Sequence, residues 1–177
     1  MSDPTAVQNQ SAVATQDAAL RQEDDAAQLN ALLRMTWAPS NYNSIRTPPQ
    51  VAPLQKDHFL EVQHFVAILI RIMKGFGEYD NWYTQQVGYF IDLATFVNEH
   101  RNLFEINDAL NQRKKRIPLD QYRTNADIRA YLQYQTTGGI TVEQSVRALL
   151  DAMVARSTPF GKYTRLVGQE FKRQLGW

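Results

Sequence analysis

The sequence contains no cysteine among its 177 residues. Disulfide scaffolds, thiolate zinc sites and cysteine nucleophiles are therefore excluded. Histidine is scarce as well, since only His58, His64 and His100 occur. His58 and Glu61 are three residues apart, but they lack a strong third ligand, and a histidine at a helix edge is the commoner reason for such a spacing. We expect neither a metal site nor another cofactor.

Long hydrophobic runs are absent too. The longest uninterrupted apolar stretch, residues 65–70, has six residues, whereas a membrane-spanning helix needs about 20. Residues 1–20 are rich in alanine, glutamine, serine and aspartate and have neither a basic start nor an apolar segment, so we expect no signal peptide. The sequence predicts a protein without a membrane partner that is made and used in a cytosol.

The motifs of common catalytic sites are also missing. The chain has no glycine-rich phosphate loop, no HExxH motif and no Ser-His-Asp motif. The carboxylates of Glu105 and Asp108, three residues apart, could do acid–base work only inside a suitable pocket, and beside a basic segment they are more simply surface charges. A small hydrolase that uses Glu105, Asp108 or His58 is an alternative with little support, and we expect no enzyme.

The charges that are present are unevenly distributed, although the formal net charge is only +1. Residues 1–30 carry five acidic side chains and one arginine, whereas residues 101–123 carry six basic and three acidic side chains. The basic side chains include the run Arg113, Lys114, Lys115 and Arg116. Such a cluster is a modest hint of a polyanionic partner, and a solvated surface loop is its commoner explanation.

Apolar periodicity predicts an all-α fold. Apolar side chains recur at steps of three and four residues in three segments, which we expect to form the main helices, with two shorter helices beside them. The main helices are expected at 57–74, 84–104 and 141–156, and the shorter ones at 125–134 and 164–175. Residues 1–28 are polar and free of aromatics, which predicts a flexible N-terminal arm. Residues 29–177 are expected to form one domain, a four-helix-type bundle with a C-terminal extension.

Two stretches between these helices are expected to be irregular. Residues 38–54 contain four prolines, which interrupt regular structure. Residues 105–123 lose the apolar periodicity and gain charge, so the basic run is expected to lie in a loop. Thr124, with Asp127 three residues later, has a spacing similar to a capping box and is expected to open the next helix.

Three segments, in order along the chain, share a pattern with a known family. The first is Met35-Thr36-Trp37-Ala38-Pro39. The second is Phe90-Ile91-Asp92-Leu93-Ala94-Thr95-Phe96-Val97-Asn98-Glu99-His100-Arg101-Asn102, continued by Glu105-Ile106-Asn107 and Asn111-Gln112. The third is Gly161-Lys162-Tyr163-Thr164-Arg165, followed by Glu170, Leu175 and Trp177. Together they resemble the coat proteins of rod-shaped helical plant RNA viruses, the tobacco mosaic virus type with its hordeivirus and benyvirus relatives.

The family pattern is matched with departures. In the family, a long radial helix ends in an Arg-Asn pair and runs into an acidic stretch at the central hole, and the chain closes with Tyr-x-Arg, Phe-Glu and Leu-x-Trp. Here the spacing from Tyr163 to Trp177 is one residue longer, and Gln169 stands where phenylalanine is expected. The inner loop is basic here, whereas it is acidic or neutral in the family.

The resemblance also implies site residues. RNA would lie near the inner ends of two radial helices, here 84–104 and 141–156, with Arg101 and Arg147 on its phosphates. The run Arg113, Lys114, Lys115 and Arg116 would lie in the inner loop, either on the RNA or on the lumen surface. Glu105 and Asp108 would be the carboxylates that repel each other across subunit contacts.

The leading hypothesis is therefore a structural coat protein that polymerises with itself into a helical rod. It would encapsidate single-stranded genomic RNA without reading base sequence, and it would be found in the virion and the host cytoplasm. Phosphate contacts and base stacking suffice for such binding. The alternative is a helical adaptor or regulatory module that binds protein partners and no nucleic acid.

Overall fold

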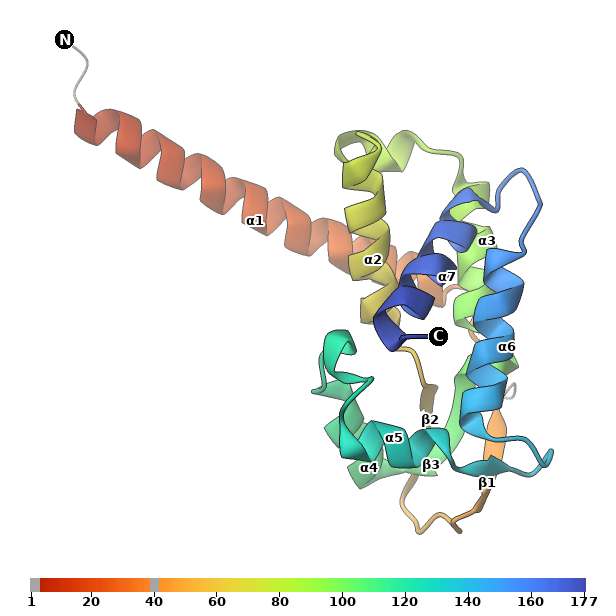
Figure 1. Ribbon diagram of the computed structural model, residues 1–177. Coiled ribbons are helices and arrows are strands. Elements are labelled where there is room, and N and C mark those ends of the chain that lie inside the picture. Colours follow the sequence, from red (N-terminus) through yellow and green to blue (C-terminus); the bar gives the residue numbers. More distant parts are fainter. Residues whose placement is uncertain (1–3, 39–41) are drawn as a thin grey trace.

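The structure, a computed structural model, describes residues 4–38 and 42–177. Over these residues the chain forms seven α-helices, three short 3-10 helices and one four-stranded sheet (Figure 1). The α-helices are α1 (Pro4–Arg34), α2 (Val62–Gly75), α3 (Val87–Val97), α4 (Asp108–Lys115), α5 (Ala126–Leu132), α6 (Val142–Val154) and α7 (Lys162–Leu175). The 3-10 helices are η1 (Tyr79–Thr84), η2 (His100–Asn102) and η3 (Leu119–Gln121). None of the described helices is both long enough and apolar enough to cross a membrane.

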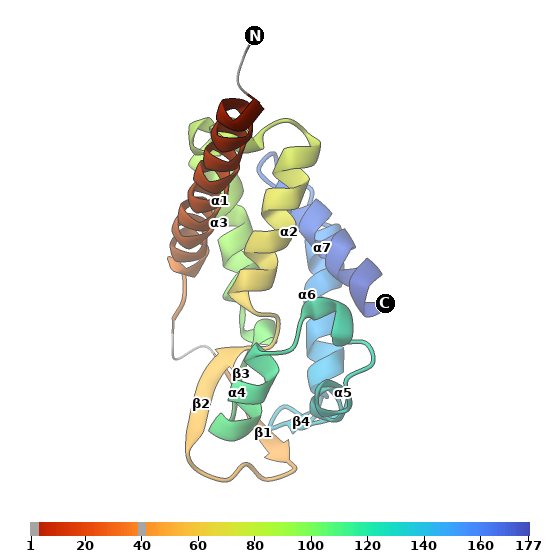
Figure 2. The same cartoon turned by 90° about the vertical axis from the view of Figure 1, so that its left-hand side faces the viewer.

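The prediction of an all-α fold is wrong, because four strands form a mixed sheet. The strands are β1 (Asn43–Thr47), β2 (Leu54–His58), β3 (Leu103–Asn107) and β4 (Gln135–Thr136). Their order in the sheet is β2-β3-β1-β4; β1 runs parallel to β3, and the other two pairs are antiparallel. Figure 2 shows the sheet at one end of the molecule, below the main helices. The fold therefore combines a helical bundle with a sheet.

Strand β3 is the centre of this sheet and replaces the end of a predicted helix. The helix predicted at 84–104 ends at Val97 in the structure, and the segment before it forms η1 and a short link. Asn102 fixes the turn into the strand, because its side chain accepts from the backbone N–H of Leu60 and donates to the carbonyls of Leu60 and Val97. The strand then pairs with β2 from Leu103 to Asn107.

The other predicted helices lie close to their predicted positions. The helix predicted at 57–74 begins only at Val62, because residues 57 and 58 complete β2. The helices predicted at 125–134, 141–156 and 164–175 correspond to α5, α6 and α7. The basic run predicted to be a loop lies instead at the C-terminal end of α4, where Arg113, Lys114 and Lys115 are the last helical residues and Arg116 is the C-cap. Asn125, and not Thr124, is the N-cap of α5, since its side-chain oxygen accepts from the N–H of Ile128.

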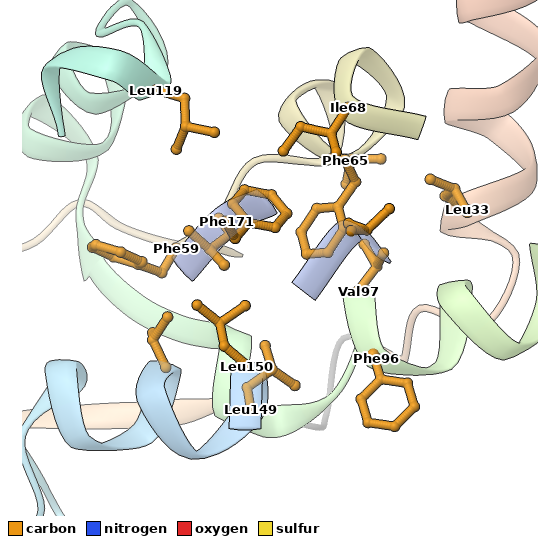
Figure 3. Packing of buried hydrophobic residues seen from close by; sticks show 14 of the residues in the cluster. Leu33, Phe59, Phe65, Ile68, Phe96, Val97, Leu119, Leu149, Leu150 and Phe171 are labelled. Carbon is orange, nitrogen blue, oxygen red and sulfur yellow. The ribbon is translucent and has the colours of Figure 1, made fainter. Parts of the chain in front are cut away.

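One hydrophobic core joins the bundle to the sheet. Phe65 of α2 packs against Phe171 of α7 with their ring centroids 4.6 Å apart, and Phe59 packs against Tyr131 of α5 at 5.2 Å. Figure 3 shows Phe59, Phe65 and Phe171 close to side chains from α3, α6 and the C-terminal end of α1. Since every main helix contributes to this core, α5, α6 and α7 hold fixed positions relative to one another.

Helix α1 has two different parts. Figure 1 shows its N-terminal part extending away from the body, and residues 12–24 are exposed. Its C-terminal part is packed, since Leu29 and Leu33 are fully buried, and Asp25 accepts hydrogen bonds from Trp82 Nε1 at 2.9 Å and Tyr79 Oη at 2.8 Å. The predicted boundary at residue 28 thus lies inside a helix. The flexibility of the arm in solution stays a prediction, and residues 1–3 lie outside the described part.

Candidate nucleic-acid interface

Arg101, predicted to bind phosphate, is engaged within the fold. Its Nε and Nη2 donate to the carboxylate of Glu99 at 2.5 and 2.7 Å, and its Nη1 donates to the carbonyl of Ala148 in α6 at 3.0 Å. A bidentate arginine–carboxylate pair is among the stronger hydrogen-bonded contacts in proteins. Arg101 therefore joins η2 to α6, and its phosphate contact stays a prediction.

The basic run 113–116 does not present one continuous surface. Arg113 pairs with Asp127 across 3.2 Å, and Lys115 pairs with Asp57 across 2.8 Å. Lys114 is 1% exposed, and its ammonium donates to the carbonyls of His58 and Phe59 and contacts Glu61. Only Arg116 is exposed without a hydrogen bond or ion pair to the residues that the structure describes.

Burial explains why Lys114 has a carboxylate partner. A buried ammonium without a partner costs several kcal/mol, roughly, so one has to be supplied inside the fold. Burial raises the pKa of Glu61 above its usual value, and the positive charge of Lys114 opposes that shift. Burial would raise the pKa of Asp57 as well, but the hydrogen bond with His58 and the charges of Lys114 and Lys115 lower it well below its usual range. Lys114 therefore anchors α4 beneath α2.

The two predicted inter-subunit carboxylates lie in different surroundings. Glu105 is a partly buried residue of β3, where the hydroxyl of Ser44 donates to it across a long 3.5 Å. Asp108 is the first residue of α4 and accepts from Gln112 Nε2 at 3.2 Å. Within the described residues, no hydrogen bond or ion pair links either carboxylate to a basic side chain. Both carboxylates are thus left without a basic partner in the described part of the chain.

Arg147, the other predicted phosphate ligand, borders a cleft. It lies on α6, where it pairs with Glu143 one turn earlier across 2.8 Å, and its guanidinium carbon lies 4.4 Å from the centroid of the Trp177 ring. The cleft has a volume of about 700 Å³ and is formed by α5, by the segment before it, by α6 and by the end of α7. Figures 1 and 2 both show the C-terminal end of α7 above α5.

Two further arginines line the cleft. Arg123 precedes α5, and Arg129 lies on the exposed face of α5, whose buried face carries Ile128 and Tyr131. Neither guanidinium has a hydrogen bond or an ion pair with any residue of the described segments. Glu143 is the single carboxylate side chain among the lining residues, and it is already paired with Arg147. The cleft therefore carries an excess of positive charge that can attract an anion.

Local structure fixes each wall of the cleft. A capping box starts α6, because Thr141 accepts from the N–H of Gln144 while the Gln144 side chain accepts from the N–H of Thr141. Gly176 ends α7 with a left-handed φ of +73°, a conformation that favours glycine. A Cβ atom at Gly176 would lie 3.1 Å from the guanidinium carbon of Arg123. A side chain at this position would therefore crowd the Arg123 guanidinium, and glycine leaves room for it.

The structure thus brings together residues that the sequence did not group. Arg147 was predicted from the family resemblance, whereas Arg123, Arg129 and Trp177 were not assigned to any site. They are separated by up to 54 positions in the chain, so no local spacing connects them. The available signal was the excess of basic residues between 101 and 123, which ends at Arg123.

Comparison of the chain with protein-family models, with curated proteins and with solved structures found no match.

Proposed function

We propose that this protein is a structural coat protein that polymerises into a helical rod and encloses single-stranded RNA. The observation that carries the proposal is the cleft in which the guanidinium groups of Arg123 and Arg129 have no carboxylate partner within the described residues, beside Arg147 and the ring of Trp177. The three segments that resemble helical plant virus coat proteins support the same function. A polyanion is a ligand whose negative charge complements the positive charge of this cleft.

The composition of the cleft suits binding that is independent of base sequence. Guanidinium groups bind phosphate through paired hydrogen bonds, and aromatic rings stack on any base. Each phosphate that is neutralised releases bound counterions, so the affinity falls steeply as salt is added. A subunit that binds few nucleotides can still hold a long RNA, because many copies repeat along the strand.

The proposal is tested by binding of a labelled uridine oligonucleotide, followed by fluorescence anisotropy at several salt concentrations. We expect Arg123→Ala with Arg129→Ala to weaken binding at least tenfold and to lower the slope of log affinity against log salt by roughly 1 to 1.5, as expected for two phosphate contacts to a single strand. The matched control is Arg46→Ala with Arg116→Ala, which removes two exposed arginines that are also unpaired in the described structure but lie outside the cleft. An equal loss in both variants would remove the cleft from the RNA site.

Self-assembly is tested by negative-stain microscopy of the purified protein at mildly acidic and at neutral pH. The proposal predicts rods or stacked discs under at least one condition. The exposed part of α1 is one surface available for contacts between copies, since residues 12–24 contribute little to the core of their own subunit. A clean monomer under all conditions would favour an adaptor that binds other proteins.

A further inference from the structure

We propose that Trp177 is a stacking platform for one base of a bound single strand, with the neighbouring phosphates held by Arg123 and Arg129. This inference rests on the proposed RNA-binding function. It adds which part of a nucleotide each side of the cleft binds: the base on the Trp177 side, and the phosphates on the side of Arg123 and Arg129. It follows from how the Trp177 ring is held, from what lies against it and from the unpaired charges that face the same space.

The backbone of Trp177 is held in place, and its ring packs against the core. Leu175 is 4% exposed and anchors the last turn of α7 in the core. The left-handed Gly176 then turns the chain back, and the N–H of Trp177 donates to the carbonyl of Lys172 at 2.9 Å. A ring held in this way loses little conformational entropy when it binds a ligand.

A chain of polar contacts positions a cation against this ring. Gln133 Nε2 donates to Glu143 at 3.0 Å, Glu143 accepts from Arg147 at 2.8 Å, and the guanidinium carbon of Arg147 lies 4.4 Å from the ring centroid. That distance is within the range of a cation–π contact. Arg147 therefore covers part of the ring, and its own charge is balanced by Glu143. Arg147 is a positioning residue for Trp177 rather than a free phosphate ligand.

The remaining surface of the Trp177 ring is available to the cleft. Trp177 is only partly buried and is one of the residues that line the 700 Å³ space. Sites for small ligands commonly have volumes of about 300–1,000 Å³, so a nucleotide unit is of suitable size. A flat aromatic surface beside two unpaired guanidinium groups matches a ligand that has a flat ring on one side and a phosphate on the other. A nucleotide has this combination.

The test separates the base contact from the phosphate contacts. Wild type, Trp177→Leu and Trp177→Phe are titrated with a uridine oligonucleotide and with an abasic oligonucleotide of equal length, which keeps the phosphates and lacks the bases. We expect Trp177→Leu to bind the uridine strand about 5- to 100-fold more weakly, which corresponds to the loss of one stacked base. Binding of the abasic strand and the salt slope should stay at wild-type values. Trp177→Phe, which keeps a flat ring, should retain most of the affinity.

A second measurement covers the case in which Trp177→Leu does not fold. Stacking of a base on an indole ring quenches its fluorescence, so the uridine strand should quench the emission of wild type and not that of Trp177→Phe, in which Trp37 and Trp82 remain. Quenching that persists in Trp177→Phe would overturn the inference.

Other outcomes are equally decisive. Uridine-strand binding by Trp177→Leu at wild-type affinity would show that no base stacks there. Equal losses on both strands would show that Trp177 only supports the fold. Free uridine monophosphate that binds as tightly as the strand would make the cleft a mononucleotide site and overturn strand binding. Absence of binding by wild type, or an unchanged salt slope in the variant that lacks Arg123 and Arg129, would instead contradict the proposed function.

Discussion

At the scale of single residues, most charged side chains that looked free in the sequence have partners inside the subunit. Arg101 is bound to Glu99, and Lys114 is buried against Glu61. A charge that leaves water needs a partner, and the fold supplies Glu99 for Arg101 and Glu61 for Lys114. Arg123 and Arg129 have no such partner within the described residues, and neither have Arg46 and Arg116, but of these four arginines only Arg123 and Arg129 line one common cleft.

Arg101 is expected to stabilise the fold. Arg101→Ala removes a bidentate ion pair and a hydrogen bond to the carbonyl of Ala148. Hydrogen bonds to charged groups contribute about 1.5–3 kcal/mol each when buried, and Arg101 is partly exposed, so we expect a loss of about 1–2 kcal/mol in the free energy of unfolding, measured by urea denaturation. RNA affinity should change less than threefold. A folded variant with unchanged stability that no longer packages RNA would restore Arg101 to the RNA site.

His64 is expected to make stability depend on pH. Burial, together with the positive charge of Lys114, lowers the pKa of His64 from 6.5 to about 4. The folded protein therefore keeps this ring neutral, while the unfolded chain binds a proton below pH 6.5, so His64 lowers stability as the pH falls from 6.5 towards 4. The effect amounts to about 3 kcal/mol at most.

The comparison of wild type with His64→Gln isolates this contribution. Unfolding free energies at pH 7.5 and pH 4.5 should differ less in the variant than in wild type. Glu61, whose raised pKa acts in the opposite direction, is present in both proteins and cancels in the difference. Identical pH dependence in the two proteins would show that His64 titrates normally in the fold.

At the scale of elements, the sequence predicted α2, α3, α5, α6 and α7, but it predicted a flexible arm where most of α1 forms, a loop where α4 forms, and no strands. Helix α6 carries apolar residues at regular steps over 13 positions, which is enough to define a period. The strands have two to five residues, and β1 pairs with β3 some 60 positions away. A strand of that length has no measurable alternation, and its stability comes from partners that local sequence does not reveal. The cleft could not be predicted from local sequence either, because its walls meet only after α5, α6 and α7 have packed.

Helix α1 is expected to consist of a dispensable part and an essential part. Removal of residues 1–20 should leave the melting temperature within about 2 °C of wild type, because residues 12–20 are exposed. Removal of residues 1–28 also takes away Asp25, which leaves Trp82 Nε1 and Tyr79 Oη without their acceptor. A buried donor without a partner costs about 1–3 kcal/mol, so this truncation should melt several degrees lower in thermal denaturation. Equal melting of the two truncations would mean that Asp25 contributes nothing.

At the scale of the whole molecule, the body and the arm have opposite charge. Asp17, Glu23 and Asp24 lie on the exposed part of α1, whose N-terminal end extends away from the body in Figure 1, and the body holds most of the basic side chains. Within a polymer, such an arrangement permits contacts between the acidic part of one copy and the basic part of another. If Glu105 and Asp108 lie at contacts between copies, as the sequence predicts, their charges would act against assembly.

Assembly is therefore expected to be stronger at acidic than at neutral pH. Protonation of carboxylates removes their mutual repulsion at subunit contacts. Glu105→Gln with Asp108→Asn should reduce the pH dependence of rod or disc formation, measured by light scattering and microscopy between pH 5 and pH 7.5. A control with Asp151→Asn changes an exposed carboxylate that pairs with Lys172 in its own subunit. A variant that assembles with the pH profile of wild type would exclude Glu105 and Asp108 from the subunit contacts.

We propose that the cleft of Arg123, Arg129, Arg147 and Trp177 holds RNA in an assembled coat. The most direct test is the 260/280 nm absorbance ratio of particles assembled with RNA and freed of unbound nucleic acid, for wild type, for Arg123→Ala with Arg129→Ala and for Arg46→Ala with Arg116→Ala. We expect particles of wild type and of the control to carry RNA, and particles of the cleft variant to form without it. Particles of the cleft variant with the RNA content of wild type would show that RNA is not bound in the cleft.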